Sequence, residues 1–238
     1  MAKLKRGHSF LVRDRLRKDI DKVSSYAKGY LLDVGCGSKP YFYLFKQVDE
    51  YIGMDIPLDI YEDKESKAVA RKSAIDVYGS ALDIPFKSES FDAVVCFQVL
   101  EHLPEPARAV SEMARCLKPG GHLILSTNFL WPLHDIPYDF FRFTEFGLKY
   151  LIEKSGLTLK QIEKELGFVG TLACHLCKFI VTVLPFRAFW KIMVVVIQIF
   201  AGWLDRVVTD YMKSIGKEER TVCNYLVVAQ KPKEKKEV

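Results

Sequence analysis

Two glycines and a distant acidic residue suit the recognition of an adenosine-containing cofactor. The apolar run 30–34 leads into the segment LLDVGCGSKP, where Gly35 and Gly37 allow the backbone to turn tightly and approach a ligand. Asp55 ends the next apolar run, 20 residues after Gly35, where a carboxylate accepts hydrogen bonds from ribose hydroxyls. The pair predicts a cofactor with an adenosine moiety at the ends of these two runs.

Pro40 bears on which cofactor this is. The dinucleotide fingerprint places a third glycine where this chain has Pro40, so a nicotinamide dinucleotide loses support. A pyrophosphate also needs free backbone donors at a helix N-terminus. S-adenosylmethionine carries no phosphate and makes no such demand. A nicotinamide-dependent oxidoreductase nevertheless remains an alternative, since the same kind of sheet hosts many chemistries.

The elements that position these residues alternate along the chain. Apolar, β-rich runs read as strands at 30–34, 51–54, 75–79, 91–97 and 122–127. A helix is predicted over 104–117, and an amphipathic helix near the N-terminus carries Leu16, Ile20, Val23 and Ala27 on one face. Strands and helices in this order require a parallel sheet with right-handed crossovers, so we predict a doubly wound α/β fold whose ligand lies at the carboxyl ends of the strands.

Four further segments follow the first in a characteristic order: YIGMD at 51–55, GSALDIPF at 79–86, FDAVVCFQVLEHL at 91–103 and LKPGGHLILSTN at 117–128. Together they resemble the class I S-adenosylmethionine-dependent methyltransferases, in particular the type 11 methyltransferase domain family. The resemblance covers roughly residues 28–170 and a last strand near 222–230. It implies a Rossmann-like, mostly parallel seven-stranded sheet with an antiparallel last strand, methyltransferase activity, and S-adenosylmethionine as the cofactor.

The same resemblance implies which residues bind the cofactor. The methionine end of the cofactor would lie against Asp33, Gly35, Cys36 and Gly37. Its ribose would be bound by Asp55 and Ile56, and its adenine amino group by Asp83 and Ile84. The sulfonium would lie beside Gln98. Purely structural roles remain open for three of them: Asp33 as a cap of local backbone, Asp83 as the start of a turn, and Gln98 as the start of a helix.

Methylation of a hydroxyl or ammonium group also needs a base. His134, with Asp135 or Asp139, and His102 are the candidates, and we predict His134, His102 and Asp139 as catalytic residues. His122 begins a strand and so lies at the wrong end of the sheet. The segment 131–142 would line the acceptor pocket with the side chains of Trp131, Tyr138, Asp139, Phe141 and Arg142. Its alternative role is a loop that fixes the start of the following helix at Thr144.

The residues after the fourth strand restrict which kind of acceptor atom can be methylated. Methylases of exocyclic base amines carry Asn or Asp followed by Pro-Pro and an aromatic residue there, whereas this chain reads CFQV. Oxygen, carbon and aliphatic nitrogen therefore remain as acceptor atoms. KPY at 39–41, FFRFTEFGL at 140–148 and an apolar insertion resemble methyltransferases of sugar and polysaccharide biosynthesis, which implies a small-molecule or lipid-linked glycan or isoprenoid acceptor.

The apolar insertion spans 171–221. Its run 192–204 has 13 residues, short of the roughly 20 that cross a bilayer as a helix. Aromatic residues and cations flank it, which suits a membrane interface: Trp190, Trp203, Lys178, Arg187, Lys191 and Arg206. We predict peripheral membrane contact through 176–206, with an apolar lid or a dimer surface as the alternative.

Composition sets the remaining expectations. The net charge of +5 is mild, and no aromatic residues interleave the basic ends as in a nucleic-acid platform, so no nucleic acid is expected. Six scattered cysteines indicate a reducing, cytoplasmic compartment, and the pair Cys174 and Cys177 lacks a second ligand pair, so no metal is predicted.

Four parts are predicted along the chain: a helix at 1–28, the methyltransferase core at 29–170, the insertion at 171–221, and the last strand with a basic tail at 222–238. The N-terminus has no apolar core of signal-peptide length, so secretion is not expected. A non-catalytic, methyltransferase-like interaction module at a membrane is a further alternative, because intact cofactor residues do not exclude it.

Overall fold

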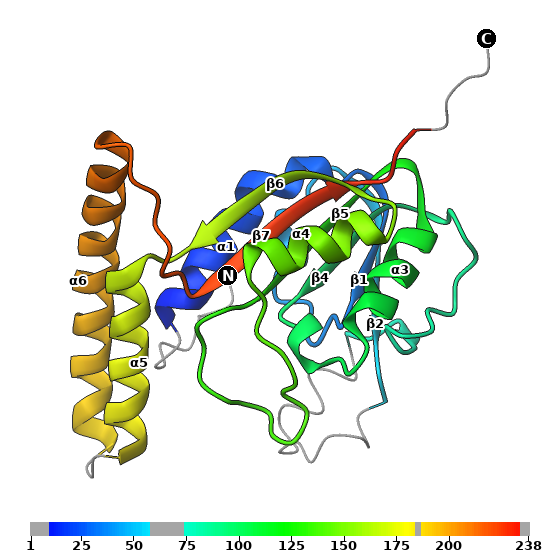
Figure 1. Cartoon of the computed structure of the whole chain (residues 1–238). Coiled ribbons are helices and arrows are strands. Elements are labelled where there is room, and N and C mark those ends of the chain that lie inside the picture. The colour runs from blue at the N-terminus through cyan, green and yellow to red at the C-terminus, as the bar shows by residue number, and fades with distance from the viewer. Residues whose placement is uncertain (1–9, 58–73, 184–186, 234–238) are drawn as a thin grey trace. The chain divides into compact units, whose positions relative to one another are not determined.

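A seven-stranded sheet forms the centre of the fold (Figure 1). The computed structural model describes residues 10–57, 74–183 and 187–233. The strand order is β3-β2-β1-β4-β5-β7-β6. The strands are β1 (Gly29–Val34), β2 (Val48–Asp55), β3 (Val77–Tyr78), β4 (Phe91–Phe97), β5 (Leu117–Asn128), β6 (Thr158–Glu165) and β7 (Asn224–Gln230). This architecture confirms the predicted Rossmann-like sheet.

Strand directions follow the prediction as well. β1 pairs in parallel with β2 and β4, β2 with β3, and β4 with β5. β7 runs the other way beside β5: Phe129 N donates to Cys223 O at one end, and Gly120 N donates to Lys231 O at the other. The change of direction lets the last strand pair in antiparallel fashion with β5.

The helices are α1 (Phe10–Val23), α3 (Pro106–Cys116), α4 (Glu145–Lys154), α5 (Phe168–Val183) and α6 (Arg187–Ser214), with short 3-10 turns at Ser24–Tyr26, Phe42–Leu44 and Leu100–His102. Figure 1 shows α3 and α4 on one face of the sheet. The predicted apolar face of the first helix is buried from Leu16 to Ala27. α4 begins where Thr144 caps it by accepting a hydrogen bond from Gly147 N at 3.1 Å.

Several boundaries differ from the sequence prediction: β2 begins at Val48, β3 is limited to Val77–Tyr78, and the first helix ends at Val23. Two further differences are larger. β5 begins at Leu117 rather than His122, because the residues read as helix breakers, 118–121, continue the strand, with Gly120 at a positive φ of 83°. α6 is one continuous helix of 28 residues. Its part Ile192–Ser214 has a mean hydropathy of 1.7 and is long and apolar enough to cross a membrane by length and composition alone.

The chain divides into two compact units, which are described separately. The hairpin unit comprises the stretch ending at Asp19, Asn128–Leu133 and Glu163–Tyr225. The sheet unit comprises Ile20–Thr127, His134–Ile162 and the stretch from Leu226 onward. The finer division at residues 28, 170 and 221 stays a prediction of the sequence.

Candidate functional site

The turn after β1 passes over the end of β2. Gly35 N donates to Met54 O at 2.8 Å, and the backbone reaches this position with a φ of +74°. A Cβ on Gly35 would lie 2.4 Å from Val99 Cγ2, so only glycine fits. Gly37 also has a positive φ, 53°, but nothing lies within 4 Å of a Cβ there. The turn is therefore packed beneath Gly35 and open at Gly37.

Asp55, the predicted ribose ligand, holds this turn in place. Its side chain is buried, and its carboxylate accepts hydrogen bonds from Gly37 N at 2.9 Å and from Ile56 N at 2.8 Å. Two backbone donors fix the direction of the carboxylate at the carboxyl end of β2. A carboxylate oriented in this way suits a ligand hydroxyl beside the open part of the turn.

Asp33 lies beneath the turn and is bonded to a residue that the sequence reasoning missed. Its Oδ2 accepts a hydrogen bond from Tyr51 Oη at 2.5 Å. Burial raises the pKa of Asp33 to about 7. Burial and the nearby Asp33 raise the pKa of Tyr51 as well, so the phenol remains the donor. Spacing in the sequence does not signal this tyrosine, because the contact depends on the register in which Asp33 pairs with Gly53, two residues after Tyr51 on β2.

The turn after β3 carries the predicted adenine residues. Ser80 and Asp83 form an antiparallel bridge, and the side chain of Asp83 is exposed. Ile84 is buried; its amide donates to Glu112 Oε2 at 2.9 Å, and its carbonyl accepts from Arg115 Nη2 at 2.9 Å. Two side chains of α3 thus fix this turn and leave the Asp83 carboxylate available.

Gln98 follows β4 in a left-handed backbone conformation, with a φ of +57°. Its amide donates to Ser126 O at 2.9 Å, and its Nε2 donates to Ser126 Oγ at 3.1 Å. A non-glycine residue in this region is strained and occurs preferentially at functional sites. β1 and β4 are neighbours where the strand order reverses, which is where ligands bind in such sheets.

The arrangement fits S-adenosylmethionine. The glycine turn, Asp55 and Gln98 lie at the carboxyl ends of β1, β2 and β4, respectively, and Asp83 follows β3. Open space above Gly37 admits a ligand backbone, and the carboxylates match its ammonium, ribose and adenine donors. The structure brings the predicted positions to one edge of the sheet, while the role of each residue stays a prediction.

The two predicted histidines are neighbours, with ring centroids 4.8 Å apart. His102 Nδ1 lies 2.6 Å from Tyr138 O. A carbonyl only accepts hydrogen bonds, so Nδ1 carries the proton and Nε2 keeps its lone pair. His102 Nε2 is 3.9 Å from the exposed carboxylate of Asp135. This tautomer leaves His102 able to accept a proton.

His134 is held by the carboxylate of Asp139, which accepts from His134 N at 2.9 Å and lies 3.4 Å from His134 Nδ1. Arg142 donates to both Asp139 oxygens, at 2.6 and 2.7 Å, and holds the pKa of Asp139 well below its usual range. Burial lowers the pKa of His134, which keeps its ring neutral near pH 7. Asp139 is therefore ionised and acts on His134 by positioning it.

Glu101 connects this histidine pair to the sheet and was not predicted. Its side chain is buried and accepts a hydrogen bond from Thr127 Oγ1 at 2.8 Å, while its carbonyl accepts from the amides of Phe140 and Phe141. One ligand atom each from Glu101, His102 and His134 lies within 4.8 Å of the others, a spacing that could hold a cation. Burial raises the pKa of Glu101 and favours the neutral acid, so we favour acid–base chemistry here.

Two other pairs of residues considered in the sequence analysis, Trp131 with Lys178 and Cys174 with Cys177, lie in the hairpin unit. Lys178 Nζ lies 5.5 Å from the Trp131 ring centroid and donates to Leu133 O at 3.2 Å, so both residues have packing roles there. Cys174 and Cys177 are buried thiols on one face of α5. Burial raises the pKa of Cys174 to about 12, which disfavours the thiolate.

Residues 32–125 match the family model described as a methyltransferase domain. A ubiquinone biosynthesis O-methyltransferase of Alkalilimnicola ehrlichii is 34% identical over 132 residues, which are 52% of this chain and 49% of the relative. A 27-O-demethylrifamycin SV methyltransferase of Amycolatopsis mediterranei is 31% identical over 107 residues, 43% of this chain and 39% of the relative. The chain spans about half the length, or less, of these curated relatives.

Solved structures share the fold. A putative methyltransferase from Bacillus halodurans matches with a TM-score of 0.55 and 20% identity, covering 91% of this chain and 98% of the other. A putative sarcosine dimethylglycine methyltransferase from Galdieria sulphuraria matches with a TM-score of 0.55 and 17% identity, covering 93% and 86%. At this identity the likeness concerns the fold alone.

Proposed function

We propose that this chain, whose residues 32–125 match a methyltransferase domain family, transfers a methyl group from S-adenosylmethionine to a small-molecule or lipid-linked acceptor. The observation that carries the proposal is the packed glycine turn, whose open side is bordered by the oriented Asp55 carboxylate. Asp33, Gly35, Cys36, Gly37, Ile56, Asp83, Ile84 and Gln98 complete the proposed cofactor site.

The cofactor, when bound, supplies an electrophilic methyl group. We assign His102 and His134 to the acceptor proton: His102 Nε2 keeps a lone pair, and the depressed pKa of His134 leaves its ring neutral. Either ring could take the proton of an acceptor hydroxyl, and Asp139 would position His134. Such a base contributes about a hundredfold or more to the rate. Oxygen is the favoured acceptor atom, with carbon and aliphatic nitrogen as alternatives.

A lipid-linked acceptor of glycan or isoprenoid type is the finer part of the proposal. Named relatives over this segment include O-methyltransferases of ubiquinone biosynthesis and of a rifamycin. A chain that modifies a lipid-linked molecule must meet it at a membrane face. We therefore propose peripheral contact with the cytoplasmic face of the membrane through residues 176–206, which include an exposed apolar part of α6.

Calorimetric titration with S-adenosylhomocysteine tests the cofactor site. We expect micromolar binding by the natural chain, lost in Asp55→Ala and kept in Asp210→Ala, whose carboxylate is exposed on α6. A nicotinamide dinucleotide serves as the second ligand. Binding of the dinucleotide alone would instead favour an oxidoreductase, and binding of neither would favour a non-catalytic interaction module.

Transfer of a labelled methyl group to membrane lipid extracts and to polyprenylated phenols tests the acceptor. At least one of His102→Ala and His134→Ala should lower kcat by about a hundredfold while S-adenosylhomocysteine affinity stays the same, and the variant that does so identifies the base. The assay is repeated with a chelator, since activity that falls on chelation would point to a cation at Glu101, His102 and His134. Full transfer by both histidine variants would contradict the proposed base.

A further inference from the structure

Lys39 lies at the end of the glycine turn and is not among the residues assigned to the cofactor. Its amide donates to Cys36 O at 2.8 Å, and its backbone is left-handed, with a φ of +49°. A lysine seldom adopts this conformation, because its Cβ crowds the backbone, whereas glycine adopts it freely. Such an outlier points to a function for the side chain. Lys39 is therefore a candidate for a role that glycine could not fill.

The side chain of Lys39 crosses β2. In the sheet, β2 lies between β1 and the edge strand β3. A Cβ on Gly53 would clash with Lys39 Cε, so the aliphatic stem of the lysine packs on the backbone of Gly53 in β2. Beyond Gly53, Lys39 Nζ donates a hydrogen bond to Asp76 Oδ2, directly before β3. One side chain thus connects the turn after β1 with the start of β3.

Asp76 is held in place independently of Lys39. Its Oδ2 also accepts a hydrogen bond from Gly53 N at 2.7 Å, and its own amide donates to Gly53 O at 2.9 Å. Partial burial acts to raise the pKa of Asp76, but the Lys39 ammonium and the Gly53 amide outweigh it and hold this pKa below its usual value. Asp76 is therefore ionised near pH 7 and suits a charge-assisted hydrogen bond from Lys39.

The ammonium of Lys39 also lies beside the tyrosine that is bonded to Asp33. Lys39 Nζ is 5.6 Å from the centroid of the Tyr51 ring, within the range of a cation–π contact. The hydroxyl of Tyr51 donates to Asp33 Oδ2 at 2.5 Å. The Lys39 side chain is only 17% exposed, whereas that of Asp76 is 48% exposed. Lys39 is thus largely covered by the residues beneath the turn.

The bridge between Lys39 and Asp76 spans the two halves of the proposed cofactor site. The turn that carries Lys39 is assigned to the methionine end, whereas Asp55 on β2 and Asp83 after β3 are assigned to the adenosine. Without Lys39, β2 and β3 would remain bonded through Asp76 and Gly53, while the turn would lose this link to β3. A site whose halves are fixed in advance binds a ligand with a smaller cost of ordering.

We propose that Lys39 is a positioning residue for the cofactor: its bridge to Asp76 holds the glycine turn at the distance from β3 that a ligand occupying both halves of the site requires. The inference rests on the proposed cofactor site and extends it by two residues, neither of which is assigned a contact with the ligand. An exposed ion pair would leave ligand binding unchanged, because water screens it and both side chains stay mobile. Lys39 differs in its covered stem and its fixed partner.

Two ligands distinguish this role from a general loss of structure. S-adenosylhomocysteine occupies both halves of the site, whereas 5′-methylthioadenosine lacks the amino-acid end. In calorimetric titrations of the full chain, Lys39→Met should bind S-adenosylhomocysteine about tenfold more weakly than the natural chain, and 5′-methylthioadenosine within about twofold of it. Methionine keeps an unbranched apolar stem and removes the charge.

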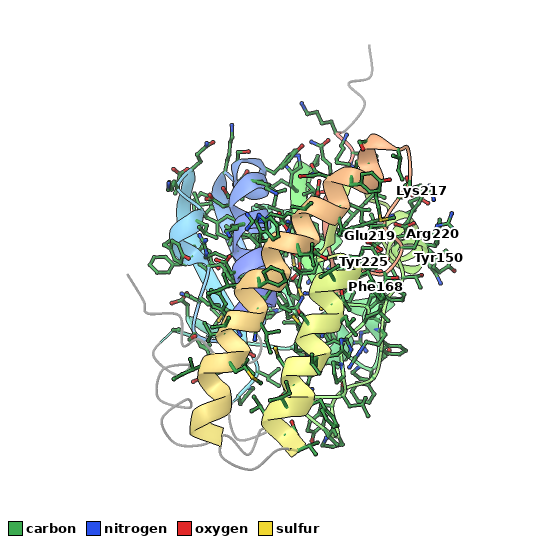
Figure 2. The ribbon with its side chains drawn as sticks, turned by 90° about the vertical axis from the view of Figure 1, so that its left-hand side faces the viewer. Tyr150, Phe168, Lys217, Glu219, Arg220 and Tyr225 are labelled. Atoms are coloured by element: carbon green, nitrogen blue, oxygen red, sulfur yellow. The ribbon has the colours of Figure 1, made fainter. Side chains whose placement is uncertain are left out.

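Further variants test the charge and the partner. Lys39→Arg should stay within about threefold of the natural chain for both ligands, because the guanidinium is also a charged donor. Lys217→Met is the matched control, since Lys217 is an exposed lysine of the hairpin unit (Figure 2), and should leave both affinities unchanged. Asp76→Asn should weaken S-adenosylhomocysteine binding about fivefold, and Lys39→Met added to it should cost only about twofold more, because the two residues act as a pair.

Three outcomes would overturn the inference. One is S-adenosylhomocysteine binding by Lys39→Met at the natural affinity. Another is an equal loss for both ligands, which would make Lys39 a structural residue of the whole site. The third is an undiminished loss from Lys39→Met in the Asp76→Asn background, which would exclude Asp76 as the partner. A natural chain that binds neither ligand would refute the proposed cofactor site itself, so the two failures are distinguishable.

Discussion

The turn after β1 and the α5–α6 hairpin differ in what they bury and what they expose. At the turn, carboxylates are buried and oriented by named donors, and the backbone adopts left-handed angles that only glycine fits at Gly35. On the hairpin, Asp205 and Gln198 are buried while large apolar side chains face outward. The first region suits a polar ligand, whereas the second presents a surface that suits an apolar medium.

This contrast shows how strongly each region constrains its sequence. A ligand turn needs particular atoms at particular positions, so short motifs such as LLDVGCGSKP identify it. An apolar face needs only side chains of one class at helical spacing, so many sequences satisfy it and no motif marks it. Substitutions that affect one region and leave the other intact test the comparison.

The largest effect is expected for Gly35→Ala. Its Cβ would clash with Val99 at a positive φ, which costs about 2–5 kcal/mol of unfolding free energy and abolishes S-adenosylhomocysteine binding. Gly156→Ala is the matched control, since Gly156 has a φ of +78° with nothing within 4 Å of a Cβ, and should cost about 1 kcal/mol. Urea unfolding measures both; equal losses would show that the contact with Val99 is unimportant.

Asp205→Ala should destabilise the α5–α6 hairpin. Two buried amides at the start of α5 would lose their acceptor, which costs about 2–4 kcal/mol and raises hydrogen exchange along α5. Asp210→Ala on the same helix should stay within about 0.5 kcal/mol. Cofactor affinity should change less than twofold. Unchanged exchange in Asp205→Ala would mean that this carboxylate does not hold the hairpin together.

Glu165→Gln should change how stability depends on pH. Burial raises the pKa of Glu165 to about 8; Asp19 and Arg15 face it from α1, and Asn224 donates to it from β7. A raised carboxyl pKa means that the fold keeps a proton which the unfolded chain releases near pH 4, so stability falls as pH rises from about 4 to about 8. The variant should flatten that decline and gain on the order of 2 kcal/mol near pH 9. The unfolding free energies of both chains, measured across this pH range, test the prediction. If the variant shows the same decline of stability with pH, Glu165 is not the source of that decline.

Tyr51→Phe should give the smallest effect. Asp33 loses a hydrogen-bond donor, which costs about 1 kcal/mol, and its pKa moves further above its usual range. The loss should grow as pH rises past about 7, because the ionised Asp33 is the form that needs the donor. Tyr43→Phe, on an exposed ring, is the control. A loss independent of pH would indicate packing rather than this hydrogen bond.

Much of the candidate site could be predicted because the chemistry of a ligand turn is local in sequence. Asp55 and the two glycines lie at strand ends that apolar patterning alone revealed, and parallel strands bring their carboxyl ends to one edge. Tyr51, Glu101 and the Arg142 clamp on Asp139 were not predicted as partners, because each depends on a register or a loop path that spacing does not encode.

The sequence by itself determined the doubly wound sheet, the glycine turn and the apolar character of 192–204, since periodicity and glycine positions follow from local backbone sterics and hydrophobic patterning. Only the tertiary structure decided that α5 and α6 form a hairpin joined at Asp205, that its apolar residues face outward, and that His102 and His134 are neighbours. Contacts between residues distant in sequence depend on how whole elements pack, and packing is a property of the complete chain.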